Sequence, residues 1–268
     1  MAEAKSSLTM IVLSAQKISK RFGGVQALKN ITLVVKQGEI FGLMGPNGAG
    51  KTTLFNVITG YYRPDQGAIS LAGRILPVGQ PYKIAQRGLV RTFQNIRLFS
   101  EMSVLDNVRV GTHICSTQGL WGAIWPSGSV LAQEQELIQR SREYLAWMGL
   151  GQYEHRMART LSYGQQRRLE IARALAAQPS LLALDEPAAG MNGQEREELG
   201  LMIKKIQQHG ITIIVIEHDV RWMMGLCDRL MVLHHGECLA EGLPLEIQQH
   251  PEVIRAYLGT SEKAPRVR

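Results

Sequence analysis

The sequence predicts an α/β fold with a mixed, mostly parallel sheet as its core and an inserted helical subdomain. Short runs of β-branched and apolar residues alternate with helical stretches, the pattern of strands joined by crossover helices. The composition agrees, because 45% of the 268 residues are hydrophobic and 20% are charged, which excludes a disordered chain or a collagen-like repeat. No stretch reaches the ~18 apolar residues of a membrane-spanning helix.

Charge and cysteine content limit the partners and the cellular compartment that we expect for the protein. Thirty Lys and Arg against 23 Asp and Glu give a net charge of +7, which suits an anionic partner such as a nucleotide, a nucleic acid or a membrane surface. Cys115, Cys227 and Cys238 are too few and too far apart for a disulfide framework or a zinc site. Residues 1–7 lead into an expected first strand at 8–13 and lack a signal-peptide cleavage pattern. We therefore expect a protein that stays in a reducing cytoplasm and can sit on a membrane.

The first part of the core is expected to contain several strands and one helix. The run 31–35 alternates apolar and polar residues, whereas 40–44 is continuously apolar, as in a strand inside a parallel sheet. A glycine-rich loop follows, and then a helix at 51–59 that ends at Gly60. Further strands are expected at 68–71, after a turn at 63–67, and at 90–94.

The middle of the chain reads as helical. Ser103 and Asp106 have the spacing of a capping box, which predicts a helix start. An apolar face predicts a second helix, and its members are Leu131, Leu137, Ile138, Leu145 and Met148. We expect a helical subdomain at about 95–164, inserted between core segments at about 10–94 and 165–259, with a short tail at 260–268.

In the second part of the core, predicted strands again alternate with a helix. Strands are expected at 181–184 and 211–216, separated by an amphipathic helix at 195–208. A hairpin follows, and short helical turns close the fold. These last elements are expected at 229–234, 238–241, 245–247 and 253–258.

A phosphate-binding loop follows the 40–44 strand. The residues match G-x-x-x-x-G-K-[ST], in which glycines let backbone N–H groups point at phosphates and the next helix adds its positive end. Lys51 would reach the β- and γ-phosphates, and the Thr52 hydroxyl would bind Mg²⁺. The alternative is a structural glycine-rich turn. The loop comprises Gly45, Pro46, Asn47, Gly48, Ala49, Gly50, Lys51, Thr52 and Thr53.

Two acids end the 181–184 strand. A parallel strand delivers its C-terminal residues to the ligand crevice, beside the phosphate loop. Asp185 would then hold Mg²⁺, and Glu186 would orient and deprotonate the attacking water. The alternative is an ordinary charge pair after a core strand.

A third motif opens a helix at Ser162, a good N-cap residue whose helix would offer a second anion site. On its own this is only a capped helix. With the phosphate loop, the acid pair and an isolated His218 after a strand, however, the order of motifs resembles that of ATP-binding-cassette (ABC) ATPases from Val12 to Gly259. The resemblance implies a P-loop NTPase fold of the ABC ATPase type, with ATP and Mg²⁺ as its ligands.

The resemblance also implies roles for further residues. Phe22 would stack on adenine, unless it is a core residue. Gln94 would touch Mg²⁺ and the water, and His218 would bond the γ-phosphate. The signature residues Ser162, Gly164 and Gln165 would contact the nucleotide of a second subunit, and 188–192 would be the D-loop.

Two positions depart from the family pattern. Tyr163 replaces a glycine, which we expect to be tolerated because Ser162 and Gly164 keep their donors. Asn192 replaces an aspartate and so loses a negative charge. We expect this change to affect the communication between the two nucleotide sites of a dimer and not the binding of ATP.

Within the family, the chain is most similar to the ATP-binding subunits of branched-chain amino-acid importers. This resemblance implies two membrane-spanning permease subunits, a second ABC ATPase subunit (a similar chain or a second copy), an indirectly coupled periplasmic binding protein and a place at the cytoplasmic face of the inner membrane. Nucleic acid is not an expected partner. The segments that carry the resemblance to branched-chain importer subunits are 21–24, 90–94, 167–173, 185–190 and 253–259.

Other functions stay open at this point. Urea or amide importers and lipopolysaccharide exporters share much of the pattern. A soluble ABC ATPase acting on ribosomes or DNA would suit the positive charge, but such chains usually carry two cassettes or a long inserted coiled coil, and this chain has one cassette and no heptad run. A P-loop kinase would leave 161–165 and His218 unexplained. Finally, Trp121 and Trp125 lie in an uncharged segment at 119–130 that suits either a lipid or permease contact or a local hydrophobic cluster.

Overall fold

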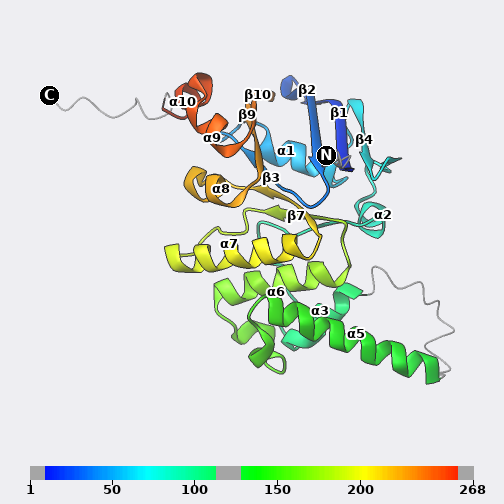
Figure 1. Cartoon of the computed structure of the whole chain (residues 1–268). Coiled ribbons are helices and arrows are strands. Elements are labelled where there is room, and N and C mark those ends of the chain that lie inside the picture. Colours follow the sequence, from blue (N-terminus) through cyan, green and yellow to red (C-terminus); the bar gives the residue numbers. More distant parts are fainter. Residues whose placement is uncertain (1–9, 113–127, 259–268) are drawn as a thin grey trace, which may run out of the picture.

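The computed structural model describes residues 10–112 and 128–258, and Figure 1 shows their arrangement. Trp121, Trp125, Cys115 and the 260–268 tail lie outside the described residues. Within the described ranges, none of the helices combines the length and apolarity needed to cross a bilayer.

The central sheet has six strands in the order β10-β9-β3-β8-β7-β6. All pairs are parallel except the β9–β10 hairpin, which confirms the predicted mixed, mostly parallel sheet. Its inner strands β3, β7 and β8 are buried along their whole length, which explains their continuous apolar sequences. The strands are β3 (Ile40–Met44), β6 (Leu89–Arg91), β7 (Leu181–Asp185), β8 (Thr212–Ile216), β9 (Arg229–His234) and β10 (Glu237–Gly242).

A second sheet, which is antiparallel, covers one side of the central sheet, and its strand order is β2-β1-β4-β5. The predicted first strand at 8–13 is wrong in its extent, because β1 runs from Ile11 to Phe22 and forms a long hairpin with β2. Register shifts after Ala15 and Ile18 break the period-two pattern that would have revealed the strand in the sequence. The strands are β1 (Ile11–Phe22), β2 (Val25–Lys36), β4 (Gln66–Leu71) and β5 (Arg74–Ile75).

The helices fall into two groups. Those around the core are α1 (Lys51–Ile58), α2 (Pro81–Gln86), α7 (Gly193–Gln208), α8 (Val220–Leu226), α9 (Pro244–Gln249) and α10 (Pro251–Leu258). Those of the helical layer are α3 (Val104–Thr112), α5 (Gly128–Trp147) and α6 (Tyr163–Ala176), joined by the 3-10 turns η1 (Gly151–Tyr153) and η2 (Ala158–Thr160).

The helical layer is held by close packing of α3, α5 and α6. The predicted start of α3 is confirmed, because Ser103 Oγ accepts a hydrogen bond from the Asp106 amide at 3.0 Å. Helices α3 and α6 approach so closely that a Cβ at Gly111 would overlap the Arg173 carbonyl oxygen. Leu145 and Met148, from the predicted apolar face, are fully buried. Since α6 packs on both other helices, the helical layer continues past residue 164.

The central sheet separates two hydrophobic clusters. Neighbouring residues of β3 point to opposite sides, so that Ile40 joins the cluster against the helices and Phe41 joins the cluster under the antiparallel sheet and α1. Strand β6 ends at Arg91, so the prediction that a strand reaches Gln94 is wrong. The Thr92 amide still bonds Ala183 O, and the chain then leaves the sheet toward the helical layer.

Candidate functional site

The phosphate-loop residues lie between β3 and α1, as the motif requires. Lys51 Nζ donates hydrogen bonds to Gly45 O at 2.7 Å and Pro46 O at 3.0 Å. The side chain is mostly buried, and this burial lowers the pKa of Lys51, although the nearby charge of Glu186 acts in the opposite direction. The loop therefore holds the Lys51 side chain at its centre, on two of its own backbone carbonyls.

Glycine is required at two loop positions. Gly45 has φ +150°, and a Cβ there would overlap the Leu233 carbonyl oxygen at the end of β9. Gly50 has φ +103°, and a Cβ there would lie 2.8 Å from Ala27 O on β2. The loop is thus pressed between β9 and the β1–β2 hairpin, with a backbone that other residues rarely adopt.

A cavity of about 410 Å³ opens at this loop. It brings residues 47–53 together with Glu186, which lies more than 130 positions away in the sequence. Five lining residues were missed by the sequence analysis, because their only signals were a glycine pair before β2 and a turn after β9. They are Val25, Gln26, Ala27, His235 and Gly236.

Asp185 is the last residue of β7 and is buried. Its Oδ2 forms an ion pair with Arg91 Nη2 at 2.5 Å. The residues expected to hold Mg²⁺, namely Asp185, Thr52 and Gln94, supply oxygen donors, which suit this hard cation. No cluster of three or more His, Cys, Asp or Glu that could hold a metal occurs among residues 10–112 and 128–258. The donor set therefore fits a metal whose coordination is completed by phosphate oxygens.

Glu186 and Gln94 lie together. Gln94 Nε2 donates a hydrogen bond to Glu186 Oε2 at 2.9 Å, although the two residues are 92 positions apart in the sequence. Glu186 has φ +44°, a left-handed conformation rare for glutamate, and its amide donates to Ile216 O on β8 at 3.0 Å. This turn directs the Glu186 side chain away from β7 to the cavity.

His218 follows β8 and has an exposed side chain, outside the residues that line the cavity. Its Nδ1 lies 3.4 Å from Glu217 Oε2. Glu217 is buried and accepts hydrogen bonds from the amides of Ala188 and His218, at 3.0 and 3.1 Å. Burial raises the pKa of Glu217, and the two amide donors oppose that shift. One carboxylate therefore joins the His218 segment to the 188–192 segment.

The Ser162 motif forms a capped helix end. Ser162 Oγ accepts from the Gln165 amide at 3.4 Å, and Gln165 Oε1 accepts from the Ser162 amide at 3.0 Å, a reciprocal capping box. None of Ser162, Gly164 and Gln165 lines the cavity at the phosphate loop. Within one chain, the motif and the loop therefore do not form one site.

Phe22 ends β1 and is 44% exposed, so it is not a core residue. Its ring contacts Tyr62 edge to face, with centroids 5.2 Å apart, and Lys20 Nζ lies 5.4 Å from the Phe22 ring centroid. Phe22 does not line the cavity, but the hairpin residues Val25, Gln26 and Ala27, just after it, do. An exposed ring therefore stands close in sequence to the cavity wall.

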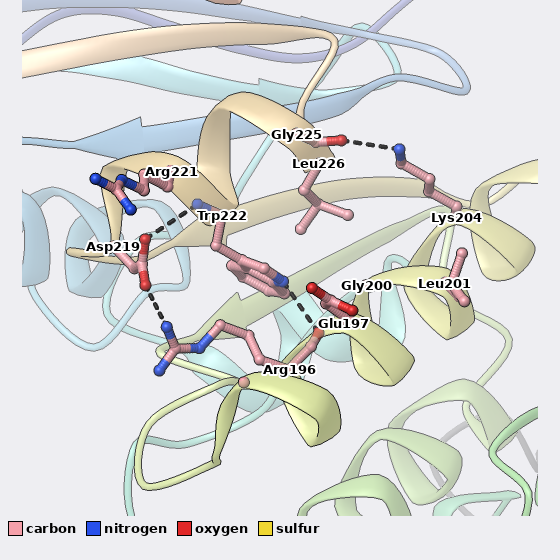
Figure 2. Close-up of a pocket in the computed structure, with 11 residues that line it drawn as sticks. Arg196, Glu197, Gly200, Leu201, Lys204, Asp219, Arg221, Trp222, Gly225 and Leu226 are labelled. Atoms are coloured by element: carbon pink, nitrogen blue, oxygen red, sulfur yellow. Dashed lines mark hydrogen bonds and ion pairs between the residues drawn. The ribbon is translucent and has the colours of Figure 1, made fainter.

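A second hollow, of about 650 Å³, lies between α7 and α8 (Figure 2). Arg196 pairs with Asp219, and its backbone oxygen accepts a hydrogen bond from the Trp222 indole at 3.1 Å. Arg196 Nη2 also donates to Met191 O at 3.3 Å. This network connects the 188–192 segment to the residue after His218.

Asn192 caps α7. Its Oδ1 accepts from the Glu195 amide at 3.0 Å, while Glu195 Oε2 accepts from the Asn192 amide at 3.1 Å. The oxygen that Asn192 shares with aspartate is thus used for capping.

The C-terminal helix also reaches the phosphate loop. Burial raises the pKa of Tyr257, on α10, to about 12, and a hydrogen bond from the Gly45 backbone opposes the shift. Tyr257 belongs to the 253–259 segment that resembles branched-chain importer subunits, and nothing in the sequence indicates this contact.

Comparison with known families and proteins gives one consistent picture. The family model described as "ABC transporter" matches residues 28–189, and the model "Branched-chain amino acid ATP-binding cassette transporter" matches residues 237–263. The chain is 44% identical to the high-affinity branched-chain amino acid transport ATP-binding protein LivG of Salmonella typhimurium, over 92% of this chain and 98% of that protein. It is 40% identical to BraF of Pseudomonas aeruginosa, with the same coverage.

Solved structures agree with these matches. The ADP conformation of MJ1267, an ATP-binding cassette of an ABC transporter, superposes with a TM-score of 0.81 at 31% identity. The match covers 94% of this chain and 100% of that one. A nucleotide-free cassette from an ABC transporter gives a TM-score of 0.79 at 30% identity, over 92% and 99% of the two chains.

Proposed function

The chain belongs to the family of ABC transporter ATP-binding subunits, and from that premise we propose that it hydrolyses ATP to power the uptake of branched-chain amino acids. The observation that carries the choice of cargo is the 44% identity to a branched-chain LivG protein over nearly the full length of both chains. The match of residues 237–263 to a branched-chain-specific model supports it independently.

Residues 45–53 would bind the ATP phosphates. Their glycines allow the tight backbone, and the first residues of α1 line the cavity, where the N–H groups of a helix N-terminus can bind phosphate. Lys51 would exchange its bonds to the Gly45 and Pro46 carbonyls for bonds to phosphate oxygens, which are stronger because both groups are charged. Phe22, whose exposed ring lies three residues before the cavity-lining Val25 in the sequence, would offer that ring to adenine.

Hydrolysis would depend on Glu186. It lines the cavity beside the phosphate loop, where a carboxylate can take a proton from an attacking water. Gln94, which contacts Glu186, would orient that water, and His218 would hold the γ-phosphate. Thr52, Asp185 and Gln94 would hold Mg²⁺. When bound, Mg²⁺ would supply charge neutralisation at the β- and γ-phosphates.

The complete site would need a second subunit. Ser162, Gly164 and Gln165 do not line the cavity, but the exposed N-terminus of α6 can donate to the γ-phosphate bound by another chain. ATP would then hold two subunits together, and hydrolysis would release them. Transport requires only that ATP binds the closed pair more tightly than the open one.

Two membrane-spanning permease subunits, a second ABC ATPase subunit and, indirectly, a periplasmic binding protein would complete the transporter. The chain would sit at the cytoplasmic face of the inner membrane, and nucleic acid would not be a partner.

The test is reconstitution. The chain is co-purified with the membrane subunits encoded beside it and placed in liposomes that enclose ATP. We expect ATP-dependent uptake of leucine, isoleucine or valine with the cognate binding protein outside. Uptake of urea instead, or hydrolysis that no branched-chain amino acid stimulates, would reject the proposed cargo; absence of ATP hydrolysis would reject the activity.

A further inference from the structure

Arg91 links the strand that carries Asp185 to the helix that follows the phosphate loop. Its Nη2 contacts Asp185 Oδ2 at 2.5 Å. Its Nη1 donates hydrogen bonds to Asn56 Oδ1 at 2.6 Å and to Thr59 Oγ1 at 3.0 Å, both at the C-terminal end of α1. One guanidinium thus spans β6, β7 and α1.

The guanidinium is also held from its faces. Its central carbon lies 4.7 Å from the centroid of the Phe55 ring, 5.3 Å from that of Tyr61 and 5.5 Å from that of Phe93. Only 9% of the Arg91 side chain and 6% of the Asp185 side chain are exposed. Because arginine keeps its charge and its plane is fixed by these contacts, Asp185 carries a permanent, immobile counter-ion.

This pairing has a consequence for metal binding. A positive charge beside the carboxylate offsets the attraction that Asp185 exerts on a cation, and the effect is strong where solvent is excluded. The ion pair uses Oδ2, whereas Oδ1 takes no part in it. Within residues 10–112 and 128–258, no group of three or more His, Cys, Asp or Glu is placed to hold a metal together with Asp185.

We propose that Arg91 is a positioning residue that prevents Asp185 from binding a divalent cation by itself, so that the metal enters the site together with the phosphates of the nucleotide. The negative charge of the phosphates then overcomes the repulsion from Arg91, and Asp185 offers the metal its other oxygen. This inference rests on the proposed function for one point, the role of Asp185 as a metal ligand.

The experiment measures Mn²⁺ binding to the full chain without nucleotide, by electron paramagnetic resonance. Wild type and Asp185→Asn are expected to bind Mn²⁺ equally weakly. Arg91→Gln is expected to bind at least about tenfold more tightly, and Arg91→Gln with Asp185→Asn is expected to lose that gain. Arg91→Lys, which keeps the charge, is expected to behave as wild type. If Arg91 were purely structural, Arg91→Gln would lower the melting temperature without creating an Asp185-dependent metal site.

An unchanged affinity in Arg91→Gln, or a gain that persists in the double variant, would overturn the proposal. If Arg91→Gln does not fold, Mn²⁺ binding to wild type and to Asp185→Asn still tests the proposal. Asp185-dependent Mn²⁺ binding before ATP is added would refute the proposal. Asp185-dependent binding only after ATP is added would support it. ATP binding and hydrolysis by wild type are measured in parallel. Their absence would reject the proposed function, and the nucleotide-free Mn²⁺ titration would still report on Arg91 and Asp185.

Discussion

Gln94 Nε2 donates a hydrogen bond to Glu186 Oε2 across 2.9 Å, which joins the segment entering the helical layer to the end of β7. Glu186 is the proposed base, so one of its oxygens is engaged by Gln94 while the other is available to a water. A movement of the helical layer that displaced Gln94 would therefore alter the base directly.

Glu186→Gln is the first prediction that follows from this arrangement. The variant keeps the shape and polarity of the side chain but cannot accept the proton of water. We expect hydrolysis by the assembled transporter to fall by about 10²–10⁴-fold, with ATP affinity within about twofold of wild type. Phosphate release and ATP titration measure the two quantities. Glu197→Gln, an exposed glutamate on α7, is the control and should leave both unchanged; hydrolysis near the wild-type rate in Glu186→Gln would remove Glu186 from this role.

Lys51→Ala is expected to weaken ATP binding about 10- to 100-fold, because a charge-assisted hydrogen bond to phosphate contributes about 1.5–3 kcal/mol. Calorimetric titration of the isolated chain gives the affinity. Lys204→Ala is the matched control, since Lys204 also donates to a backbone carbonyl, that of Gly225 at 2.8 Å, but lies away from the loop. Unchanged affinity in Lys51→Ala would contradict phosphate binding by this lysine.

Ser162→Ala separates binding from cooperation between subunits. ATP affinity of the isolated chain should stay at the wild-type value, because Ser162 does not line the cavity, whereas hydrolysis in the assembled transporter should fall at least about tenfold. The lost helix cap costs about 1 kcal/mol of stability. Ser103→Ala, which removes the cap of α3, is a matched control for that cost and should retain hydrolysis. Loss of ATP binding by the isolated Ser162→Ala chain would argue against a site shared between two subunits.

The sequence was sufficient to predict those parts of the fold that are marked by a pattern within one short segment. Strands β3, β7 and β8 are buried on both faces and therefore read as continuous apolar runs, and the phosphate loop is defined by glycines that its backbone requires. The register shifts in β1 removed the corresponding signal from the antiparallel sheet, which is why the extent of that strand was wrong.

Long-range pairings could not be predicted in the same way. Arg91 and Asp185 are 94 positions apart, and nothing in either local sequence indicates that they form an ion pair. His235 and Gly236 reach the cavity only because β9 lies next to β3, and Tyr257 reaches Gly45 only because α10 folds back. These contacts follow from the packing of complete elements, which periodicity and propensity do not describe.

The pH dependence of stability tests Glu217, whose pKa is raised by burial above its ordinary value of 4.5. The folded chain therefore holds this proton more tightly than the unfolded chain. The resulting stabilisation is complete below pH 4.5 and is lost as the pH rises through the folded pKa. Glu217→Gln has no such titration, so its melting temperature minus that of wild type should increase as the pH is raised from about 4 to about 7.

Only the slope of this difference is diagnostic. Ala188 and His218 donate to different oxygens of Glu217, and in Gln an amide nitrogen, which cannot accept, replaces one of them, so the substitution adds an offset that does not depend on pH. Scanning calorimetry at several pH values gives the slope, and Glu197→Gln, which removes an exposed carboxylate, should show almost none. A difference that stays constant across the range would show that burial does not perturb Glu217. A difference that decreases would mean that the two amide donors and His218 stabilise the charged carboxylate more than burial penalises it, so that the pKa of Glu217 is lowered and not raised.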